Sequence, residues 1–359
     1  MTGRERFINN ALGKPADRGI LWADGLWGET RERWIKEGMT DGYDFGYDFS
    51  EADPNGRPSV IYGYAPAFQI RVLEDMGEKQ RIVDEYGVEK IIMKNNPGLQ
   101  QFIKYPVTDK KDWESLKKRL DSDSPDRYLK GWEENINKSA LKGDIPITLG
   151  GGHLCGFFSF LRETMGDDCY YKIYDDEGLV RDMLVFQAER IKKMIRNVTA
   201  AVPLDRLFIW EDMCYKNGPL ISPNMFRSLL LEYYSSVIET AAASGIQIID
   251  VDSDGNIDEL LPLWLDAGVN MLHPFEVQAG MDVNIVRKKF GHNFAMHGGI
   301  DKRAIAAGKN EIDAELARIR PAYESGRYIP HADHSLPPDI SFHNYLYYLD
   351  GLKKIIGIN

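Results

Sequence analysis

Carboxylates and imidazoles stand directly after several short apolar runs of this sequence, where buried β-strands would end. They are Glu211 and Asp212, Asp250, Asp252 and Asp254, Glu276, His297, and His331, Asp333 and His334. Six of the seven histidines lie at or after position 273. Such groups ligate zinc and other borderline metals, and they also exchange protons with substrates. Polar residues are common at any strand end, so only their joint placement supports the hypothesis of one shared site.

The segment that begins at Asp250 matches the opening of a calcium-binding loop, with aspartates at its first, third and fifth positions and Gly255 at its sixth. The twelfth position should be a bidentate glutamate, but it is Leu261. The residues before the motif, 246–249, form an apolar strand pattern rather than an entering helix. We therefore exclude an EF-hand, and expect Asp250, Asp252 and Asp254 to share one face of a strand.

Three glycines, Gly150, Gly151 and Gly152, follow an apolar run and precede a helical stretch. A dinucleotide-binding loop would have a glycine where Cys155 stands, and a phosphate loop would bring a Lys or Arg nearby. The glycines are instead expected to let the backbone approach a ligand closely. Gly151 and His153 are therefore candidate substrate-binding residues, although a structural role fits His153 equally well.

Two other features leave their interpretation open. Trp22, Trp27 and Trp34 lie within a short span near the start of the chain, either as an aromatic lid over a flat substrate or as part of a helix packed across the bottom of the fold. His273 precedes a proline and is expected only to satisfy backbone groups.

Composition excludes several classes of protein. The 359 residues include 44 basic and 55 acidic side chains, a net charge of −11, which argues against a nucleic-acid groove or an anionic membrane surface as partner. The three cysteines contain no C-x-x-C pair, so neither a disulfide framework nor a cysteine-built zinc module is expected. The first residues are polar and lack an apolar signal segment. We expect a soluble protein of a reducing cytoplasm.

From residue 145 onward the chain alternates short apolar runs, polar or glycine turns, and amphipathic stretches of helical length, which predicts βα units and a parallel sheet. Expected strands cover 145–150, 207–211, 246–251, 270–274, 294–297 and 328–330, and expected helices lie near 176–200, 223–243, 257–267, 282–290, 311–325 and 340–355. Further strands at 20–23 and 60–64 would complete an eight-strand barrel. Residues 66–144 read as an insertion with a hairpin and with charged helices around 109–138, so 1–359 is expected to be one domain. In such a barrel the reactive groups gather at the carboxyl ends of the strands.

Several motifs together resemble one family. They are Trp210-Glu211-Asp212-Met213, Asp252-Ser253-Asp254-Gly255-Asn256, Pro274-Phe275-Glu276-Val277 with Asp282, His297-Gly298-Gly299-Ile300-Asp301, and Pro330-His331-Ala332-Asp333-His334. With them the chain resembles the uroporphyrinogen decarboxylase superfamily, in its branch of cobalamin-dependent methyltransferases. The resemblance implies a single (β/α)8 TIM barrel. Decarboxylases of the family carry an N-terminal arginine-rich motif that binds the acidic substrate, and no such segment is present here.

The resemblance also bears on the metal and the methyl donor. Thiol-methylating members hold zinc with a His-x-Cys pair and a distant cysteine, but here the matching positions are Asp252 and Asp254, and 330–334 contains no cysteine. The chain better resembles members that move a methyl group from a methoxylated compound, such as a methoxyaromatic, to a corrinoid protein. The resemblance thus implies Zn²⁺ and a cobalamin carried by a partner.

Roles follow for the residues named above. Glu276 and His297 are the leading metal ligands, with Asp252 and His334 competing for the third position. Glu211 or Asp212 would orient the substrate or protonate the leaving oxygen, which requires a raised pKa. Asp254 and His331 join Gly151 and His153 as candidate substrate-binding residues. Two rival hypotheses remain, a metal-independent decarboxylase and a non-catalytic binding protein.

Overall fold

The computed structural model describes residues 1–50 and 56–358, and its centre is a six-stranded parallel sheet in the order β12-β11-β10-β9-β6-β5. All six strands expected after residue 145 are present, with ends displaced by a few residues. Their bounds are β5 (Thr148–Gly150), β6 (Arg206–Trp210), β9 (Ile248–Asp252), β10 (Met271–His273), β11 (Ala295–Ile300) and β12 (Tyr328–Ala332). The predicted α/β fold with a parallel sheet is confirmed.

Helices connect and cover these strands, as the alternating pattern predicted. The chain forms α5 (Phe158–Met165), α6 (Asp168–Asp175) and α7 (Glu177–Thr199) before β6, then β7 (Cys214–Tyr215), β8 (Gly218–Pro219), α8 (Pro223–Leu229) and α9 (Leu231–Ala243) before β9. It continues with α10 (Leu261–Ala267), η3 (Val277–Ala279), α11 (Val283–Phe290), α12 (Lys302–Ala307), α13 (Lys309–Glu324) and α14 (Phe342–Ile356). Helix starts are capped: the Ser222 side chain accepts from the backbone N–H of Met225 with Pro223 at the first helical position.

The two faces of the strands differ. Alternate residues such as Ile249, Leu272 and Met296 belong to the large apolar core, which also contains most of the buried helix residues. The residues that alternate with them belong to a smaller apolar cluster. On four neighbouring strands these are Ile248, Met271, Ala295 and Ile329. Helix α1 (Gly3–Leu12) supplies Phe7 and Ala11 to this cluster and contacts β9, β11 and β12. The inner face of the sheet is therefore closed by apolar packing at one end.

The two additional strands expected at 20–23 and 60–64 are not formed. Trp22 makes an isolated parallel bridge to Phe49, and Val60 makes an isolated antiparallel bridge to Tyr128. Within the described residues the parallel sheet thus has six strands rather than eight. The segment around Trp22 still runs beside β12, since the Asp24 carboxylate accepts a hydrogen bond from the backbone N–H of Ala332 at 2.7 Å. Short apolar runs without regular alternation did not carry enough information to separate a strand from an extended loop.

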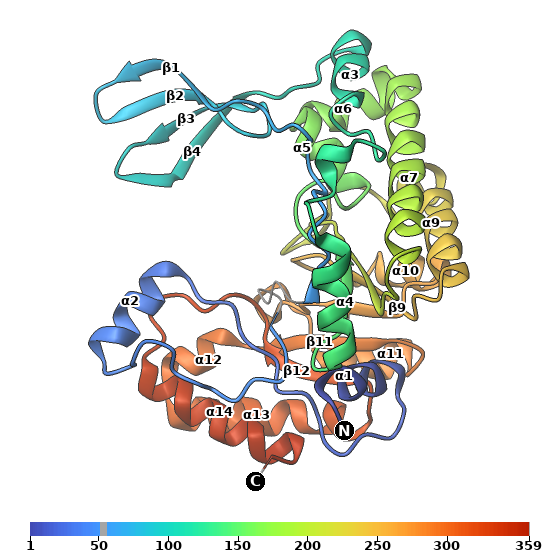
Figure 1. Cartoon of the computed structure of the whole chain (residues 1–359). Helices are drawn as coiled ribbons and strands as arrows, with labels where there is room; N and C mark the ends of the chain where they lie inside the picture. The colour runs from blue at the N-terminus through green and yellow to red at the C-terminus, as the bar shows by residue number, and fades with distance from the viewer. Residues whose placement is uncertain (51–55, 359) are drawn as a thin grey trace.

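The insertion forms a four-stranded antiparallel sheet that projects from the rest of the chain (Figure 1). Its strands are β1 (Arg71–Met76), β2 (Lys79–Val83), β3 (Glu89–Met93) and β4 (Asn96–Lys104), followed by α3 (Lys110–Lys117), η2 (Pro125–Arg127) and α4 (Trp132–Lys142). The expected hairpin and charged helices are confirmed. Near the start of the chain, α2 (Gly28–Lys36) follows an extended segment. Across the described residues, no helix combines the length and apolar character needed to span a bilayer.

Candidate functional site

A cavity of about 550 Å³ lies at the carboxyl ends of the parallel strands. Its lining contains six sequence-predicted site residues: Asp212, Asp252, Asp254, His297, His331 and His334. Asp24, Asp333 and His273 join them, with Trp22 and Trp210 as the large aromatic side chains. The structure thus brings these residues, from separate strand ends, to one cavity.

The polar groups at the bottom of the cavity, and Asp250 buried beside them, lie directly above the small apolar cluster. Asp250, His273, His297 and His331 each come two residues after a member of that cluster on the same strand. Because strand residues two apart share a face, they form the next layer of side chains toward the cavity. The position of this layer is thus fixed by the packing beneath it.

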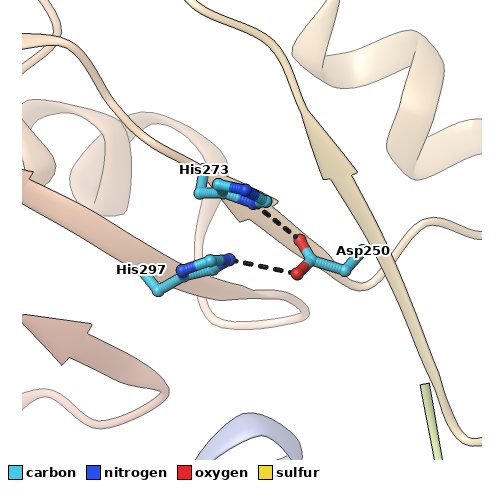
Figure 2. Close-up of side chains that lie close together, drawn as sticks. All are labelled: Asp250, His273 and His297. Atoms are coloured by element: carbon cyan, nitrogen blue, oxygen red, sulfur yellow. Dashed lines mark hydrogen bonds and ion pairs between the residues drawn. The ribbon is translucent and has the colours of Figure 1, made fainter. Parts of the chain in front are cut away.

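Asp250, His273 and His297 form the floor group, whose possible ligand atoms all lie within 4.8 Å of one another. His273 Nδ1 lies 3.1 Å from Asp250 Oδ1, and His297 Nε2 lies 3.1 Å from Asp250 Oδ2. Figure 2 shows both imidazoles converging on the carboxylate from neighbouring strands. His297 also contacts the neighbouring strand β12, since its Nδ1 lies 3.0 Å from His331 Nε2.

Arg206 balances the charge of the floor group from the side. Its Nε donates to Asp250 Oδ2 at 2.8 Å, and both side chains are completely buried. Burial alone would raise the pKa of Asp250, but Arg206 and His273 hold it well below its ordinary value. Burial, reinforced by the charge of His273, lowers the pKa of His297 well below its ordinary value. His297 is therefore a neutral imidazole, the form that ligates metals.

His273 differs, because it lies between two aspartates. Its Nε2 is 3.5 Å from Asp252 Oδ1 on the side opposite Asp250. Burial opposes its positive charge, but Asp252 and Asp250 outweigh this and raise the pKa of His273 to about 10. His273 is therefore protonated, and its positive charge lies between the carboxylates of Asp250 and Asp252.

One carboxylate and two imidazoles make a suitable donor set for a divalent borderline cation such as zinc. The compact spacing of the floor group and its burial fit such an ion, which would take the place of the proton that His273 now shares with the aspartates. The floor group could hold a metal. Of the predicted ligands Asp252, Glu276, His297 and His334, it contains only His297.

Asp254 and His334 form the mouth pair, nearer to solvent. Asp254 Oδ2 lies 3.3 Å from His334 Nε2, and each side chain is a little over one third exposed. The hydrogen bond to Asp254 raises the pKa of His334. Asp212 lies beside the pair, where its Oδ1 accepts from the backbone N–H of Asp254 at 3.3 Å.

Asp212 has two properties of a functional carboxyl. Its backbone φ is +47°, in the left-handed region that non-glycine residues adopt at a cost. Burial, with repulsion from Asp254 and Asp252, raises its pKa to about 6. Glu211 lies elsewhere: its carboxylate accepts from the backbone N–H groups of Phe157 at 2.6 Å and Ser159 at 3.0 Å, and from the Tyr234 hydroxyl. Glu211 thus anchors the start of α5 rather than facing the cavity.

His331 and Trp22 form one wall of the cavity. Their rings are stacked with centroids 5.3 Å apart at an interplanar angle of 9°. Burial lowers the pKa of His331 to about 3, so this imidazole is neutral. Neither interpretation of the tryptophans holds for all three, because Trp34 is buried against Tyr345 and Trp27 is exposed.

Besides Glu211, three further predicted site residues lie outside this cavity. Glu276 lines a separate cavity of about 270 Å³, where its Oε2 accepts from the backbone N–H of Gly255 at 3.0 Å. His153 lines a neighbouring cavity of about 450 Å³ and pairs with Glu163. Gly151, at φ +76°, packs so closely that a Cβ would lie 2.4 Å from the Phe208 ring. The expected pairing of Glu276 with His297 therefore does not occur in this cavity.

Sequence reasoning missed Arg206 and the importance of Asp250 and His273. Alternation had already put Asp250 on the same face as Asp252, and this was a usable signal. The proline after His273 predicts only a backbone role for this residue, but in strand β10 its side chain lies on the face opposite to that of Leu272, which packs in the large apolar core. The parallel register, in which His273 lies opposite Asp252 and Met271 opposite Asp250, cannot be read from one sequence.

Comparisons with known proteins agree with this architecture. The sequence model of the family described as "Uroporphyrinogen decarboxylase (URO-D)" matches residues 162–355, more than half of the chain. A solved methyltransferase from Methanosarcina mazei has a TM-score of 0.62 at 16% identity, covering 99% of this chain and 98% of that chain. Xylanase B from Clostridium stercorarium F9 has a TM-score of 0.34 at 11% identity, covering 60% and 75%, which is too low to inform function. No curated protein sequence matches the chain.

Proposed function

The chain belongs to the uroporphyrinogen decarboxylase (URO-D) family, and from this premise we propose that it is a methyltransferase. It would move a methyl group from a methoxylated aromatic donor to the cobalt of a separate corrinoid protein. The observation that best supports this proposal is the cavity itself. It has a group able to hold a metal at its floor and titratable carboxyls above that group. The methyltransferase of the same fold from Methanosarcina mazei supports this choice of reaction.

Asp250, His273 and His297 are the residues that would hold the metal, which we take to be Zn²⁺. Bound there, the ion would supply Lewis acidity toward the ether oxygen of the donor. Arg206 keeps Asp250 ionised and oriented, because its guanidinium donates to the oxygen that also faces His297. His331 in turn orients His297 through the contact between their ring nitrogens.

Other side chains of the cavity position the donor and handle its proton. The stacked Trp22 and His331 offer a flat wall against which an aromatic ring can lie. As the methyl–oxygen bond breaks, the bonding electrons stay on the oxygen, and we assign Asp212 to give that oxygen a proton, so that a phenol leaves. Asp212 lines the cavity and lies beside Asp254, which fits this role.

The nucleophile must come from outside the chain. The sequence contains no D-x-H-x-x-G segment of the kind that ligates cobalamin, so the reduced cobalt that accepts the methyl group is supplied by a partner corrinoid protein. We also propose that the irregular segments around Trp22 and Val60 complete the wall of a URO-D-like barrel between β12 and β5.

A metal-independent decarboxylase is the second candidate. It is favoured by Arg206, which already neutralises Asp250 without a metal. Against it, a carboxylic-acid substrate needs a cationic partner, and among the described residues the lining of the cavity includes no lysine and no arginine. Methyl transfer from an ether does not require that partner.

The proposal is tested with cob(I)alamin as the methyl acceptor and a panel of methoxylated aromatic donors. We expect donor-dependent loss of cob(I)alamin absorbance and formation of methylcobalamin, both abolished by a chelator and restored by zinc. Release of CO₂ from a carboxylic acid by the chelated protein, without methylcobalamin formation from any ether, would contradict the proposal.

A further inference from the structure

We infer that the methyl donor of this site is an uncharged methoxyphenol, and that the cavity rejects methoxylated carboxylates such as methoxybenzoates. The inference rests on the proposed function and names its substrate class. It is carried by the charged groups that line the cavity and by the partners of each one.

The lining is rich in acid and, over the part of the chain that the structure describes, free of Lys and Arg. Five aspartates contribute to it, namely Asp24, Asp212, Asp252, Asp254 and Asp333. A carboxylate on a ligand would enter this acid-rich space without a guanidinium or ammonium to receive it. Recognition of carboxylates in proteins ordinarily uses such groups.

Only some of the five aspartates have a partner in the lining that can carry positive charge. Asp252 faces His273, and Asp254 faces His334. Asp24 accepts from the backbone N–H of Ala332 at 2.7 Å and from the Tyr345 hydroxyl at 2.9 Å, both neutral donors. These hydrogen bonds, and the neutral His331 ring whose Nδ1 lies 3.8 Å from Asp24 Oδ1, bring no positive charge to this carboxyl group.

Asp333 and Asp212 are the two remaining acids of the lining, and each has a side-chain oxygen bonded by a backbone N–H group, which carries no charge. Asp333 Oδ2 accepts from the backbone N–H of Val277 at 2.8 Å. Asp212 accepts from the backbone N–H of Asp254, while Arg162 binds its backbone oxygen and lines the neighbouring cavity rather than this one. Even with a divalent cation on the floor group, the acids outnumber the cationic groups in the lining.

A methoxyphenol suits the same surroundings. Its hydroxyl group donates a hydrogen bond, and the lining offers aspartate oxygens as acceptors near Trp22 and Trp210. A benzoate of similar size has no hydrogen to donate and adds a like charge. The volume of about 550 Å³ is within the range of small-ligand sites, so the charge rather than the size separates the two compounds.

The test is calorimetric binding of two matched probes, 2-methoxyphenol and 2-methoxybenzoate, to the purified zinc-loaded protein. We expect the phenol to bind at least about tenfold more tightly, or about 1.4 kcal/mol. Raising NaCl from about 20 mM to about 500 mM should tighten benzoate binding and leave phenol binding unchanged, because salt screens repulsion. Benzoate binding that equals or exceeds phenol binding, or binding of neither probe, would overturn the inference.

Two variants separate local repulsion from general charge. Asp254→Asn should improve benzoate binding about threefold or more, whereas Asp266→Asn, on the outer surface beside Arg227, should not. Equal effects of the two variants would overturn the inference. Methylation of cob(I)alamin by methoxybenzoates with the same efficiency as by methoxyphenols would also overturn it, while leaving the methyltransferase proposal standing. Failure of every ether in that assay would instead count against the proposed function itself.

Discussion

The floor group and the mouth pair use the same side-chain chemistry in opposite surroundings. Asp250, His273 and His297 are buried, anchored on three adjacent strands and tied to Arg206. Asp254 and His334 face each other across 3.3 Å, but each is a little over one third exposed. Residue type alone therefore does not select a metal site: burial and anchoring on strands favour the floor group, whereas the mouth pair lies nearer to solvent.

The first and largest effect is on zinc affinity, and it distinguishes His297 from His334. His297→Ala should lower zinc affinity by more than about 100-fold and abolish methyl transfer, because it removes a metal ligand. Loss of a side chain that only hydrogen-bonds a ligand typically lowers metal affinity by about 10- to 100-fold. His334→Ala should keep its zinc. Competition with a chromogenic chelator measures both affinities. Loss of zinc in His334→Ala with full retention in His297→Ala would reverse the assignment.

The second effect concerns the ion pair that supports the floor. Arg206→Met leaves Asp250 buried without its guanidinium and should lower the free energy of unfolding by about 3–5 kcal/mol. Arg227→Met is the matched control, because its 3.7 Å pair with Asp266 is more than half exposed and should contribute at most about 1 kcal/mol. Urea denaturation measures both. Equal losses would show that burial of the pair adds nothing.

The third effect is the pH dependence contributed by Asp24, a buried acid of the cavity lining. Burial raises the pKa of Asp24 from 3.8 to about 7, so the folded state binds this proton more tightly than the unfolded state. Stability contributed by the protonated group is present at low pH and is lost as pH rises from about 4 to about 7. An asparagine at position 24 cannot ionise, so the Asp24→Asn variant does not lose this part of its stability as the pH rises.

The free energy of unfolding of the wild type, minus that of Asp24→Asn, should therefore fall by at most about 4 kcal/mol across this window. Asp313→Asn serves as control, since Asp313 is a surface acid bonded to Tyr347. An unchanged difference between wild type and Asp24→Asn from pH 4 to pH 7 would contradict the raised pKa of Asp24.

The fold after residue 145 was predictable because long amphipathic helices alternate with apolar runs, and β11 (Ala295–Ile300) is buried along its whole length. The start of the chain was not, since the segments at Trp22 and Val60 are held by isolated bridges and long-range contacts that leave no periodic trace. Only tertiary contacts determine whether such a segment forms a strand or an extended loop.

For the site, the sequence placed Asp252, Asp254, His297, His331 and His334 at one cavity, because strand ends of one polarity gather at one edge. It could not choose among them. Glu276 follows its strand by three residues and turns to Gly255, while His273 ends the same strand and faces Asp250. A shift of a few residues beyond a strand end changes the direction of a side chain, and spacing along the chain does not record it.

Anomalous diffraction at the zinc edge, on crystals of protein whose metal content has been measured, shows whether the floor group binds zinc. We expect about one zinc per chain and a single peak among Asp250, His273 and His297. A metal-free protein that still methylates cob(I)alamin, or a peak between Asp254 and His334, would contradict this expectation.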